Sequence, residues 1–297
     1  MRISGETKVV GLFGYPISHT LSPLMQNVAF REAGVNFIYL PFSVKSGDLE
    51  RATRAIPALG MVGINVTIPH KEKIIDYLDE VSPEVEKIGA VNTVVNRGGR
   101  LIGYNTDGEG FIESLRTKGL SLKGKEVLLL GAGGAALAIS VFLLKEGINH
   151  LVLINRTYSR ALKLIHRLKK IASSQVKLEV FEFKKRNSFP GREKIDLLIN
   201  TTSLGMHQQD PTAVDVNCFS TSTYVYDIVY NRKTRLLEEA EKRGMSCQGG
   251  VDMLIHQGAL SFKIWTGKEP PLEKMKKAVK EHLKKSYEHK NSLSYSR

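Results

Sequence analysis

Residues 127–155 read VLLLGAGGAALAISVFLLKEGINHLVLIN, and this stretch decides the fold. The apolar run 127–130 precedes a glycine cluster, an uncharged helical pattern then closes on Gly147, and a second apolar run ends at Asn155. Residues 127–144 carry no charge and are long enough to span a membrane, but a membrane span has no need of a glycine cluster. Strand, glycine turn, helix and parallel strand instead predict a doubly wound α/β domain.

The glycine turn in this stretch matches the dinucleotide-binding pattern G-x-G-x-x-G/A. Gly131, Gly133 and Ala136 occupy its three defining positions. Glycines there permit a tight turn and let backbone amides approach a pyrophosphate at the N-terminus of the following helix. Because an apolar strand precedes the pattern and a helix follows it, the sequence predicts a Rossmann-like nucleotide-binding domain.

The end of the second strand indicates which dinucleotide binds. Sites that prefer NAD usually place Asp or Glu there to bind the ribose hydroxyls. This chain continues instead as Asn155, Arg156 and Thr157, with Arg160 one helical turn later. Two guanidinium groups and a hydroxyl can bind the 2′-phosphate that a carboxylate would repel, so we expect NADP rather than NAD. The alternative is a helix that begins at Thr157 and carries solvated arginines.

The first hundred residues repeat the alternation of apolar runs and helical patterns, which predicts a second α/β layer ahead of the nucleotide-binding domain. The strands expected there are 9–14, 37–44, 61–68 and 90–95. Asn65 and Thr67 share one face of the third strand, Lys71 follows it, Asn92 lies within the fourth, and Asp107 lies in a glycine-bounded turn. Each has an ordinary explanation as a surface lysine, a paired amide or a helix cap. Together they predict a ligand site at the strand ends.

The stretch GYPISHTLSP, residues 14–23, gathers hydroxyl groups before the first expected helix. Ser22 followed by Pro23 is typical of a helix N-cap with proline at the first helical position, so free backbone amides would point toward Thr20 and Ser22. Hydroxyl donors and a helix N-terminus can bind a carboxylate without a buried arginine. The stretch therefore indicates either a site for a small carboxylated substrate or simply a well-capped helix.

Composition argues against several other classes of protein. The 297 residues carry a net charge of +13, but the basic runs have helical spacing and lack the interleaved aromatic residues of single-strand binders, so we expect no nucleic-acid partner. Cys218 and Cys247 lack CxxC spacing, and no His, Asp or Glu cluster has ligand spacing, so we expect neither a metal nor a disulfide framework. The first residues do not resemble a secretory signal, and we expect a cytoplasmic protein.

In their order along the chain, the motifs resemble those of the shikimate/quinate dehydrogenase family. They are GYPISHTLSP, INVTIPHK, GAVNTVV, NTDG, GAGGAA, NRT with its trailing arginine, NTTSLGM and GVDMLIHQG, within residues 11–270. The resemblance implies an enzyme that reversibly reduces 3-dehydroshikimate to shikimate with NADPH, on the way to chorismate and the aromatic amino acids. It implies a substrate-binding and catalytic domain in residues 1–108, completed by C-terminal helices in 255–297. Residues 109–254 would form the Rossmann domain, with a cleft between the two.

The resemblance also implies roles for individual residues. The substrate carboxylate would bind Thr20 and Ser22, and the ring hydroxyls would bind Thr67, Asn92, Asp107 and Gln257. The catalytic pair would be Lys71 and Asp107. The pyrophosphate would lie against Gly131, Gly133, Gly134 and Ala135, and the adenosine phosphate against Asn155, Arg156, Thr157 and Arg160. The two ligands would meet, near the nicotinamide, at Tyr230 and at residues 250–253, which include Gly250 and Met253.

These residue types suit the chemistry that the resemblance implies. Hydride delivery to a ketone develops negative charge on its oxygen, and a lysine ammonium such as that of Lys71 can stabilise the charge and donate the proton. Asp107 would hold Lys71 and the reacting hydroxyl in place. The cofactor performs the hydride chemistry, so no metal is needed. His19 and His70 match no role in the family.

Two departures from the family pattern leave the substrate open. Thr20 stands where the motif commonly has Ser, and Arg232 comes soon after Tyr230, where proline is common. One alternative is therefore a quinate/shikimate dehydrogenase with a broader substrate range or NAD use. Another is a non-catalytic NADP-sensing regulator on the same fold, against which the presence of Lys71 and Asp107 argues. For the assembly we expect a monomer or a homodimer.

Overall fold

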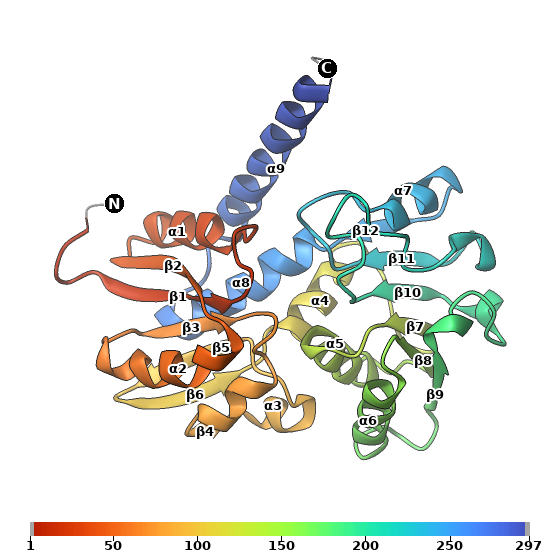
Figure 1. The fold of residues 1–297 in the computed structure, drawn as a ribbon, viewed down its shortest axis with the longest axis horizontal. Coiled ribbons are helices and arrows are strands. Elements are labelled where there is room, and N and C mark those ends of the chain that lie inside the picture. Colours follow the sequence, from red (N-terminus) through yellow and green to blue (C-terminus); the bar gives the residue numbers. More distant parts are fainter. Residues whose placement is uncertain (1–2, 295–297) are drawn as a thin grey trace. The chain divides into compact units, whose positions relative to one another are not determined.

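The computed structural model describes residues 3–294, and these divide into two compact units (Figure 1). Unit 1 combines the chain up to Val85, residues 91–106 and the chain from Leu254 onward. Unit 2 consists of residues 86–90 and 107–253. Unit 1 is thus built from both ends of the sequence, and unit 2 is built mainly from the middle.

Unit 2 contains a six-stranded sheet in which every described strand pairs in parallel, in the order β12-β11-β10-β7-β8-β9 (Figure 1). Its strands are β7 (Glu126–Leu130), β8 (His150–Asn155), β9 (Lys177–Glu182), β10 (Leu197–Asn200), β11 (Tyr224–Asp227) and β12 (Cys247–Gly249). The chain proceeds outward from β7 to β9 and then returns to β10 on the other side of β7. This reversal places the switch point of the sheet between β7 and β10, where open α/β sheets bind ligands.

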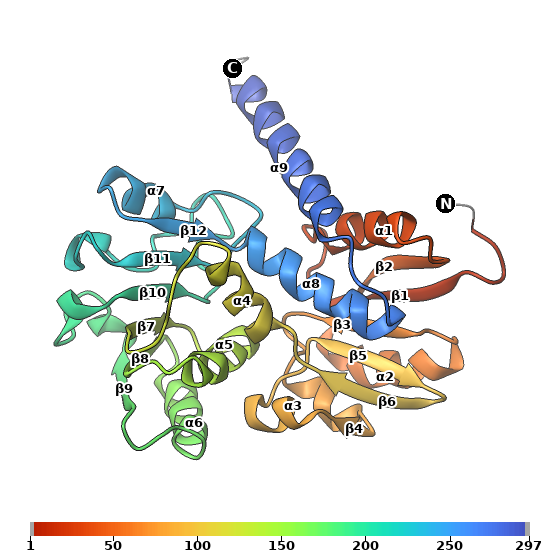
Figure 2. The same ribbon diagram turned by 180° about the vertical axis from the view of Figure 1, so that it is seen from behind.

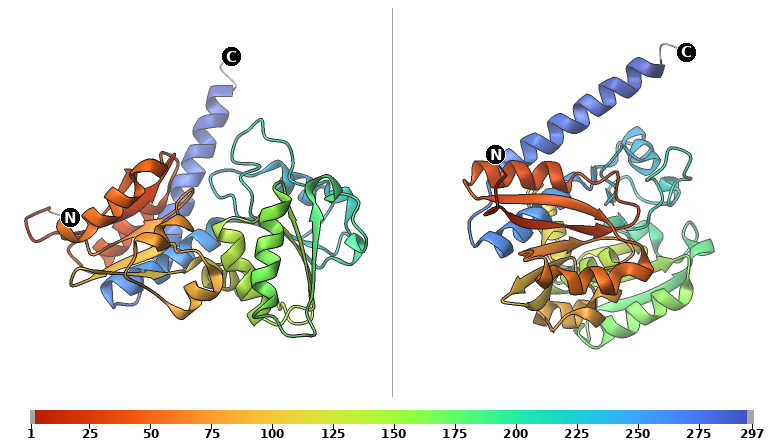
Figure 3. Two further views of the ribbon diagram at one scale, coloured as in Figure 1. Left: turned by 60° about the horizontal axis from the view of Figure 1, so that its bottom comes forward. Right: turned by 60° about the vertical axis from the view of Figure 1, so that its left-hand side comes forward.

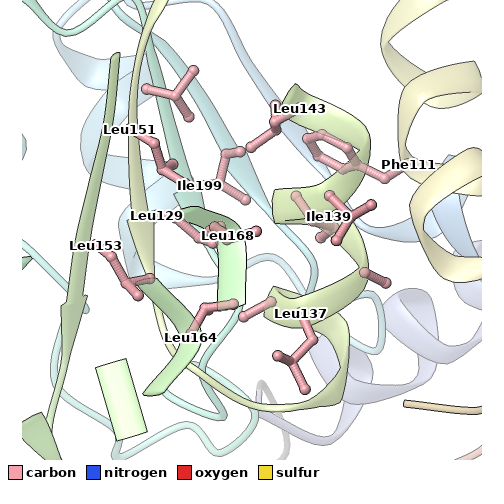
Figure 4. Close-up of a cluster of buried hydrophobic side chains, with 14 of the residues drawn as sticks. Phe111, Leu129, Leu137, Ile139, Leu143, Leu151, Leu153, Leu164, Leu168 and Ile199 are labelled. Atoms are coloured by element: carbon pink, nitrogen blue, oxygen red, sulfur yellow. The ribbon is translucent and has the colours of Figure 1, made fainter. Parts of the chain in front are cut away.

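Helices cover both faces of this sheet, which explains why β7 and β8 are continuously apolar. One face carries α4 (Asp107–Arg116), α5 (Gly134–Lys145) and α6 (Tyr158–Lys169). Figure 4 shows side chains of these helices, Phe111, Ile139 and Leu168, packed together with Leu129 of β7 and Leu153 of β8. The other face packs against α7 (Arg235–Lys242) and against residues 189–195 and 213–219. Each buried leucine contributes roughly 1.5–3 kcal/mol, so the strand-turn-helix frame is held firmly.

Unit 1 contains a mixed six-stranded sheet in the order β2-β1-β3-β5-β6-β4 (Figure 2). Its strands are β1 (Lys8–Gly14), β2 (Phe37–Ser43), β3 (Gly63–Val66), β4 (Glu80–Val81), β5 (Thr93–Arg97) and β6 (Arg100–Tyr104). The strands β1, β2 and β3 are parallel, and β5 pairs antiparallel with both β3 and β6. The carboxyl ends of β1 and β3 therefore meet at one edge.

Helices also lie on both faces of the sheet in unit 1. The apolar side chains of α2 (Leu49–Ala58) and α3 (Pro83–Ile88) pack against one face. On the other, Phe30 of α1 (Ser22–Glu32) stacks on Phe262 of α8 (Val251–Thr266) with ring centroids 5.5 Å apart. The helix α9 (Leu272–Ser294) lies beside α1 and buries Met275 and Val279 (Figure 3). Short 3-10 helices complete the fold at Ser46–Asp48, Lys73–Tyr77, Phe183–Lys185, Arg192–Lys194 and Val216–Cys218.

The predicted α/β fold is confirmed, since β7, α5 and β8 follow one another and the two strands pair in parallel. Several predicted boundaries are wrong by one to three residues, since the strands expected at 61–68 and 90–95 are Gly63–Val66 and Thr93–Arg97. The strand β3 ends just before Thr67, Asn92 precedes β5 rather than lying within it, and the N-cap of α1 is Leu21 rather than Ser22. The backbone of Asn92 remains paired on both sides, since its amide donates to the Tyr104 carbonyl at 3.0 Å and its carbonyl accepts from the Val66 amide at 2.8 Å. Within residues 3–294, no helix has the length and apolarity of a membrane span.

Candidate active site

A buried amide at the start of β5 organises the polar centre of unit 1. Asn92 is 2% exposed, and its Nδ2 donates to Thr106 Oγ1 at 2.8 Å and to Gln257 Oε1 at 3.3 Å. Its Oδ1 accepts from the backbone amide of Thr106 at 2.8 Å and from Thr93 Oγ1 at 3.0 Å. The fold thus brings together two predicted substrate ligands, Asn92 and Gln257, that are far apart in the sequence.

A second buried amide, Asn65 of β3, supports the first. Its Oδ1 accepts from Tyr39 Oη at 2.9 Å, and its Nδ2 donates at 3.0 Å to the backbone carbonyl of Asn92, to Thr93 Oγ1 and to Ser261 Oγ. The alternation along the strand indicates the face on which Asn65 lies but does not reveal its partners on neighbouring elements. The spacing of Ser261, one helical turn after Gln257 on α8, is the signal that could have found it.

The loops after β1 and β3 place hydroxyl groups at the same edge of the sheet. Ser22 is buried at the first position of α1, and its backbone N–H donates to Thr20 Oγ1 at 3.3 Å. The first turn of α1 contains no acidic residue, which leaves its partial positive charge available to an anion. A Cβ on Gly14 would lie 2.3 Å from Thr67 Cγ2, so glycine is required for Thr67 to approach β1. Thr20, Ser22 and Thr67 therefore belong to one edge.

The loop that carries Lys71 is anchored on both sides. The Lys71 backbone carbonyl accepts from the Val91 amide at 2.8 Å. The neighbouring His70 is 1% exposed, with Nε2 2.7 Å from the Val44 carbonyl oxygen. His70 therefore fixes the loop, while Lys71 is half-buried. Asp107 is the first residue of α4, is 4% exposed and belongs to unit 2.

In unit 2 the glycine turn leads from β7 into α5 as the sequence predicts. Gly131 has φ +115°, and a Cβ on it would lie 2.4 Å from Thr201 Oγ1, so only glycine is suited to this position. Gly133 is the N-cap of α5, and a Cβ there would meet nothing within 4 Å. The turn therefore has room above it at a helix N-terminus, which suits the approach of a phosphate. Gly134 and Ala135 form the first residues of this helix.

The end of β8 presents the residues expected to bind the adenosine phosphate. Asn155 Nδ2 donates to the backbone carbonyl of Thr157 at 2.9 Å and so orders the turn into α6. Arg156, Thr157 and Arg160 are exposed, and the first turn of α6 contains no acidic residue. This cationic turn follows the strand next to β7, as a 2′-phosphate site requires.

The ends of β11 and β12 position the residues predicted for the nicotinamide end. The Gly250 amide donates to the Val229 carbonyl at 3.1 Å, and a Cβ on Gly250 would lie 2.0 Å from the Ile228 carbonyl oxygen. This close approach requires glycine. Tyr230, which follows Val229 in the sequence, is half-buried. Met253 is buried in the core of unit 2.

A buried carboxylate that the sequence analysis missed lies beside this segment. Asp227, the last residue of β11, has no exposed surface. Burial raises its pKa to about 6, against the lowering effect of hydrogen bonds from Thr234, the Val229 amide and Asn200. An acidic residue that ends the apolar strand YVYD is the sequence signal that could have identified it.

Comparison with known proteins shows which family the sequence resembles. Residues 12–94 match the shikimate dehydrogenase substrate binding domain, residues 113–186 match the shikimate/quinate 5-dehydrogenase model, and residues 250–280 match the shikimate 5′-dehydrogenase C-terminal domain. Over 289 residues the chain is 44% identical to the shikimate dehydrogenase (NADP(+)) of Methanopyrus kandleri, covering 95% of this chain and 98% of that one.

Solved structures share the fold over nearly the whole chain. A shikimate dehydrogenase in complex with NADP+ is 37% identical, with a TM-score of 0.86 and coverage of 95% of this chain and 98% of that one. A quinate dehydrogenase of Corynebacterium glutamicum in complex with NAD is 30% identical, with a TM-score of 0.81 and coverage of 92% and 98%.

Proposed function

The chain belongs to the shikimate dehydrogenase family, and we propose that it reversibly reduces 3-dehydroshikimate to shikimate with NADPH through the residues described above. The observation that carries this proposal is the hydrogen bond between the buried Asn92 and the half-buried Gln257, in a chain that also carries the glycine turn before α5. Unit 1 would bind the substrate, and unit 2 would bind the cofactor.

The residues of unit 2 fit an NADP cofactor. The glycine turn at Gly131 and Gly133 suits the pyrophosphate, because a side chain at Gly131 would clash and the space above Gly133 is open. Arg156 and Arg160 would pair with the 2′-phosphate, since guanidinium groups bind phosphate through two hydrogen bonds. The nicotinamide would supply the hydride for ketone reduction.

The residues of unit 1 fit a small hydroxylated carboxylate. The substrate carboxylate would bind Thr20, Ser22 and the N-terminus of α1. Asn92 and Gln257 would bind ring hydroxyls, because an amide can donate and accept at the same time. Their mutual hydrogen bond fixes both side chains before substrate arrives, which lowers the entropic cost of binding.

Lys71 and Asp107 would perform the proton chemistry. As the hydride reaches the carbonyl carbon, the carbonyl oxygen becomes negative, and Lys71 Nζ donates a proton to it. Asp107 would accept a hydrogen bond from the reacting hydroxyl. In the reverse direction the neutral amine of Lys71 would accept the hydroxyl proton, and bound NADP+ would supply the hydride acceptor.

The test is the initial rate of nicotinamide reduction by purified protein with shikimate or quinate, each with NADP+ or NAD+. Fast turnover that requires both shikimate and NADP+ supports the proposal. Comparable quinate or NAD+ turnover would favour a quinate/shikimate dehydrogenase, for which Thr20 and the likeness to a quinate dehydrogenase argue. Tight NADP+ binding without turnover on any pair would contradict catalysis and favour a regulator.

A further inference from the structure

The carboxylate of Asp227 joins three segments of unit 2. Its Oδ1 accepts from Asn200 Nδ2 at 3.0 Å and from the Val229 amide at 3.1 Å. Its Oδ2 accepts from Thr234 Oγ1 at 2.7 Å. These donors belong to the end of β10, the loop after β11 and the N-cap of α7. One buried group therefore links the loops at the carboxyl end of the sheet.

The Asn200 side chain extends this link into the loop after β10. Its Nδ2 also donates to the Leu204 carbonyl at 3.1 Å. Its Oδ1 accepts from the Thr202 amide at 3.1 Å and from Thr202 Oγ1 at 2.7 Å. Asn200 is fully buried, so both ends of its amide are committed to holding this loop.

The segment that leads to Tyr230 is fixed at successive backbone groups. The Ile228 amide donates to the Asn200 carbonyl at 3.0 Å, and the Val229 carbonyl accepts from Gly250 at 3.1 Å. Between these bonds, the Val229 amide depends on Asp227 Oδ1. If that acceptor were lost, a buried N–H one residue before Tyr230 would have no partner, and the backbone would shift to satisfy it.

We propose that Asp227 is a positioning residue for the nicotinamide end of the site, acting through the Val229 amide on Tyr230. The inference rests on the proposed function, which places Tyr230 beside the nicotinamide. The Oδ1 side of Asp227 sets this geometry. The Oδ2 side, which holds Thr234 at the N-cap of α7, contributes to stability.

Two binding measurements separate positioning from a general loosening of unit 2. The compound 2′,5′-ADP contains the adenosine phosphates of NADP but no nicotinamide, so it tests only the glycine turn and the end of β8. The ratio of its Kd to the Kd of NADP+ measures what the nicotinamide end adds to affinity. This ratio does not depend on turnover.

The decisive variant is Asp227→Ala, with Asp227→Asn as the conservative variant that keeps an acceptor for Val229. We expect Asp227→Ala to lower kcat at least about tenfold and the Kd ratio several-fold, with 2′,5′-ADP affinity nearly unchanged. We expect Asp227→Asn to keep most of the wild-type kcat and most of the wild-type Kd ratio. If the alanine variant does not fold, Asp227→Ser replaces it, because its short hydroxyl keeps a polar group in the cavity.

Asp196→Ala is the matched control at the opposite end of the sheet. Asp196 Oδ2 accepts from the Glu126 amide at 2.9 Å, and Oδ1 pairs with Lys125 Nζ at 2.8 Å, ahead of β10. The Asp196→Ala variant should have a lower Tm and an unchanged kcat and Kd ratio. A kcat and Kd ratio in Asp227→Ala as little changed as in Asp196→Ala would overturn the inference. So would a parallel loss of 2′,5′-ADP affinity.

Tyr230→Ala distinguishes failure of the inference from failure of the proposed function. If Tyr230→Ala lowers the Kd ratio and Asp227→Ala does not, the placement of Tyr230 beside the nicotinamide is supported and the inference about Asp227 is wrong. If Tyr230→Ala leaves the ratio unchanged, Tyr230 does not lie at the nicotinamide, and the placement on which the inference rests is contradicted.

Discussion

Replacing Asp227 with asparagine should change how the stability of the protein depends on pH. Asp227 is fully buried at the end of β11, and burial raises the pKa of its carboxyl from 3.8 to about 6. Asparagine has nearly the same shape and cannot ionise. The comparison of the two proteins therefore isolates the cost of keeping this carboxylate charged.

The sign follows from the higher pKa in the folded state. The unfolded chain releases the proton more readily, so the contribution to stability is fully present below pH 3.8 and is lost as the pH rises through about 6. The difference between 3.8 and about 6 corresponds to about 3 kcal/mol at neutral pH, and about half of this is already lost at pH 5.

Urea unfolding of both proteins at pH 5 and pH 7.5 measures the effect. The free energy of unfolding of the wild type should fall between these pH values by about 1.5 kcal/mol more than that of Asp227→Asn. Loss of the hydrogen bond to Thr234 changes the free energy of unfolding of the variant by the same amount at both pH values. The contributions of other titrating groups are the same in both proteins and cancel in the comparison. An equal pH dependence in the two proteins would refute the argument that Asp227 is ionised against its burial.

Three further experiments test other parts of the structure. Gly133→Ala should fold normally, since its Cβ meets nothing within 4 Å, and calorimetry should show weaker NADP+ binding. Gly131→Ala should weaken binding too, and it should also lower the free energy of unfolding by at least about 1 kcal/mol because of the positive φ at this position. Equal stability of the two variants would contradict this. Arg156→Ala should raise the KM for NADP+ about tenfold and leave the KM for NAD+ unchanged. The control Arg54→Ala, at an exposed position of α2, should change neither KM. A parallel rise in the KM for NAD+ would show that Arg156 does not bind the 2′-phosphate. Asn65→Leu should lower the free energy of unfolding by about 2–4 kcal/mol and raise the KM for shikimate, because the hydroxyls of Tyr39 and Ser261 lose their partner. An unchanged KM would show that Asn65 does not support the substrate site.

The parts of the fold that depend on local sequence could be predicted well. The apolar run of β7, the glycine turn and the helix α5 follow from residues 127–145, where periodicity and backbone sterics act over short distances. The requirement for glycine at Gly131 also has a local component, its positive φ. The boundary at Asn92 was not predictable in this way, because its side chain bonds to Thr106 across a hairpin.

The candidate site depends on the topology more than on any local pattern. Asn92 and Gln257 meet because residues 91–106 and the part of α8 from Leu254 onward belong to the same unit, and only the order of family motifs along the chain linked them beforehand. Asp227 had no such motif. Its importance comes from three donors on separate segments, which no periodicity reveals.

The most direct test of the central claim is the rate of NADP+ reduction by shikimate in Lys71→Ala beside Lys73→Ala. Lys73 lies two residues away, is exposed and pairs with Asp76 at 2.8 Å, so its loss removes the same charge without touching the proposed chemistry. The account predicts that kcat falls at least about 100-fold in Lys71→Ala, as expected for loss of a general acid and base, and stays near the wild-type value in Lys73→Ala. Equal rates in the two variants would contradict the assignment of Lys71 as the proton donor.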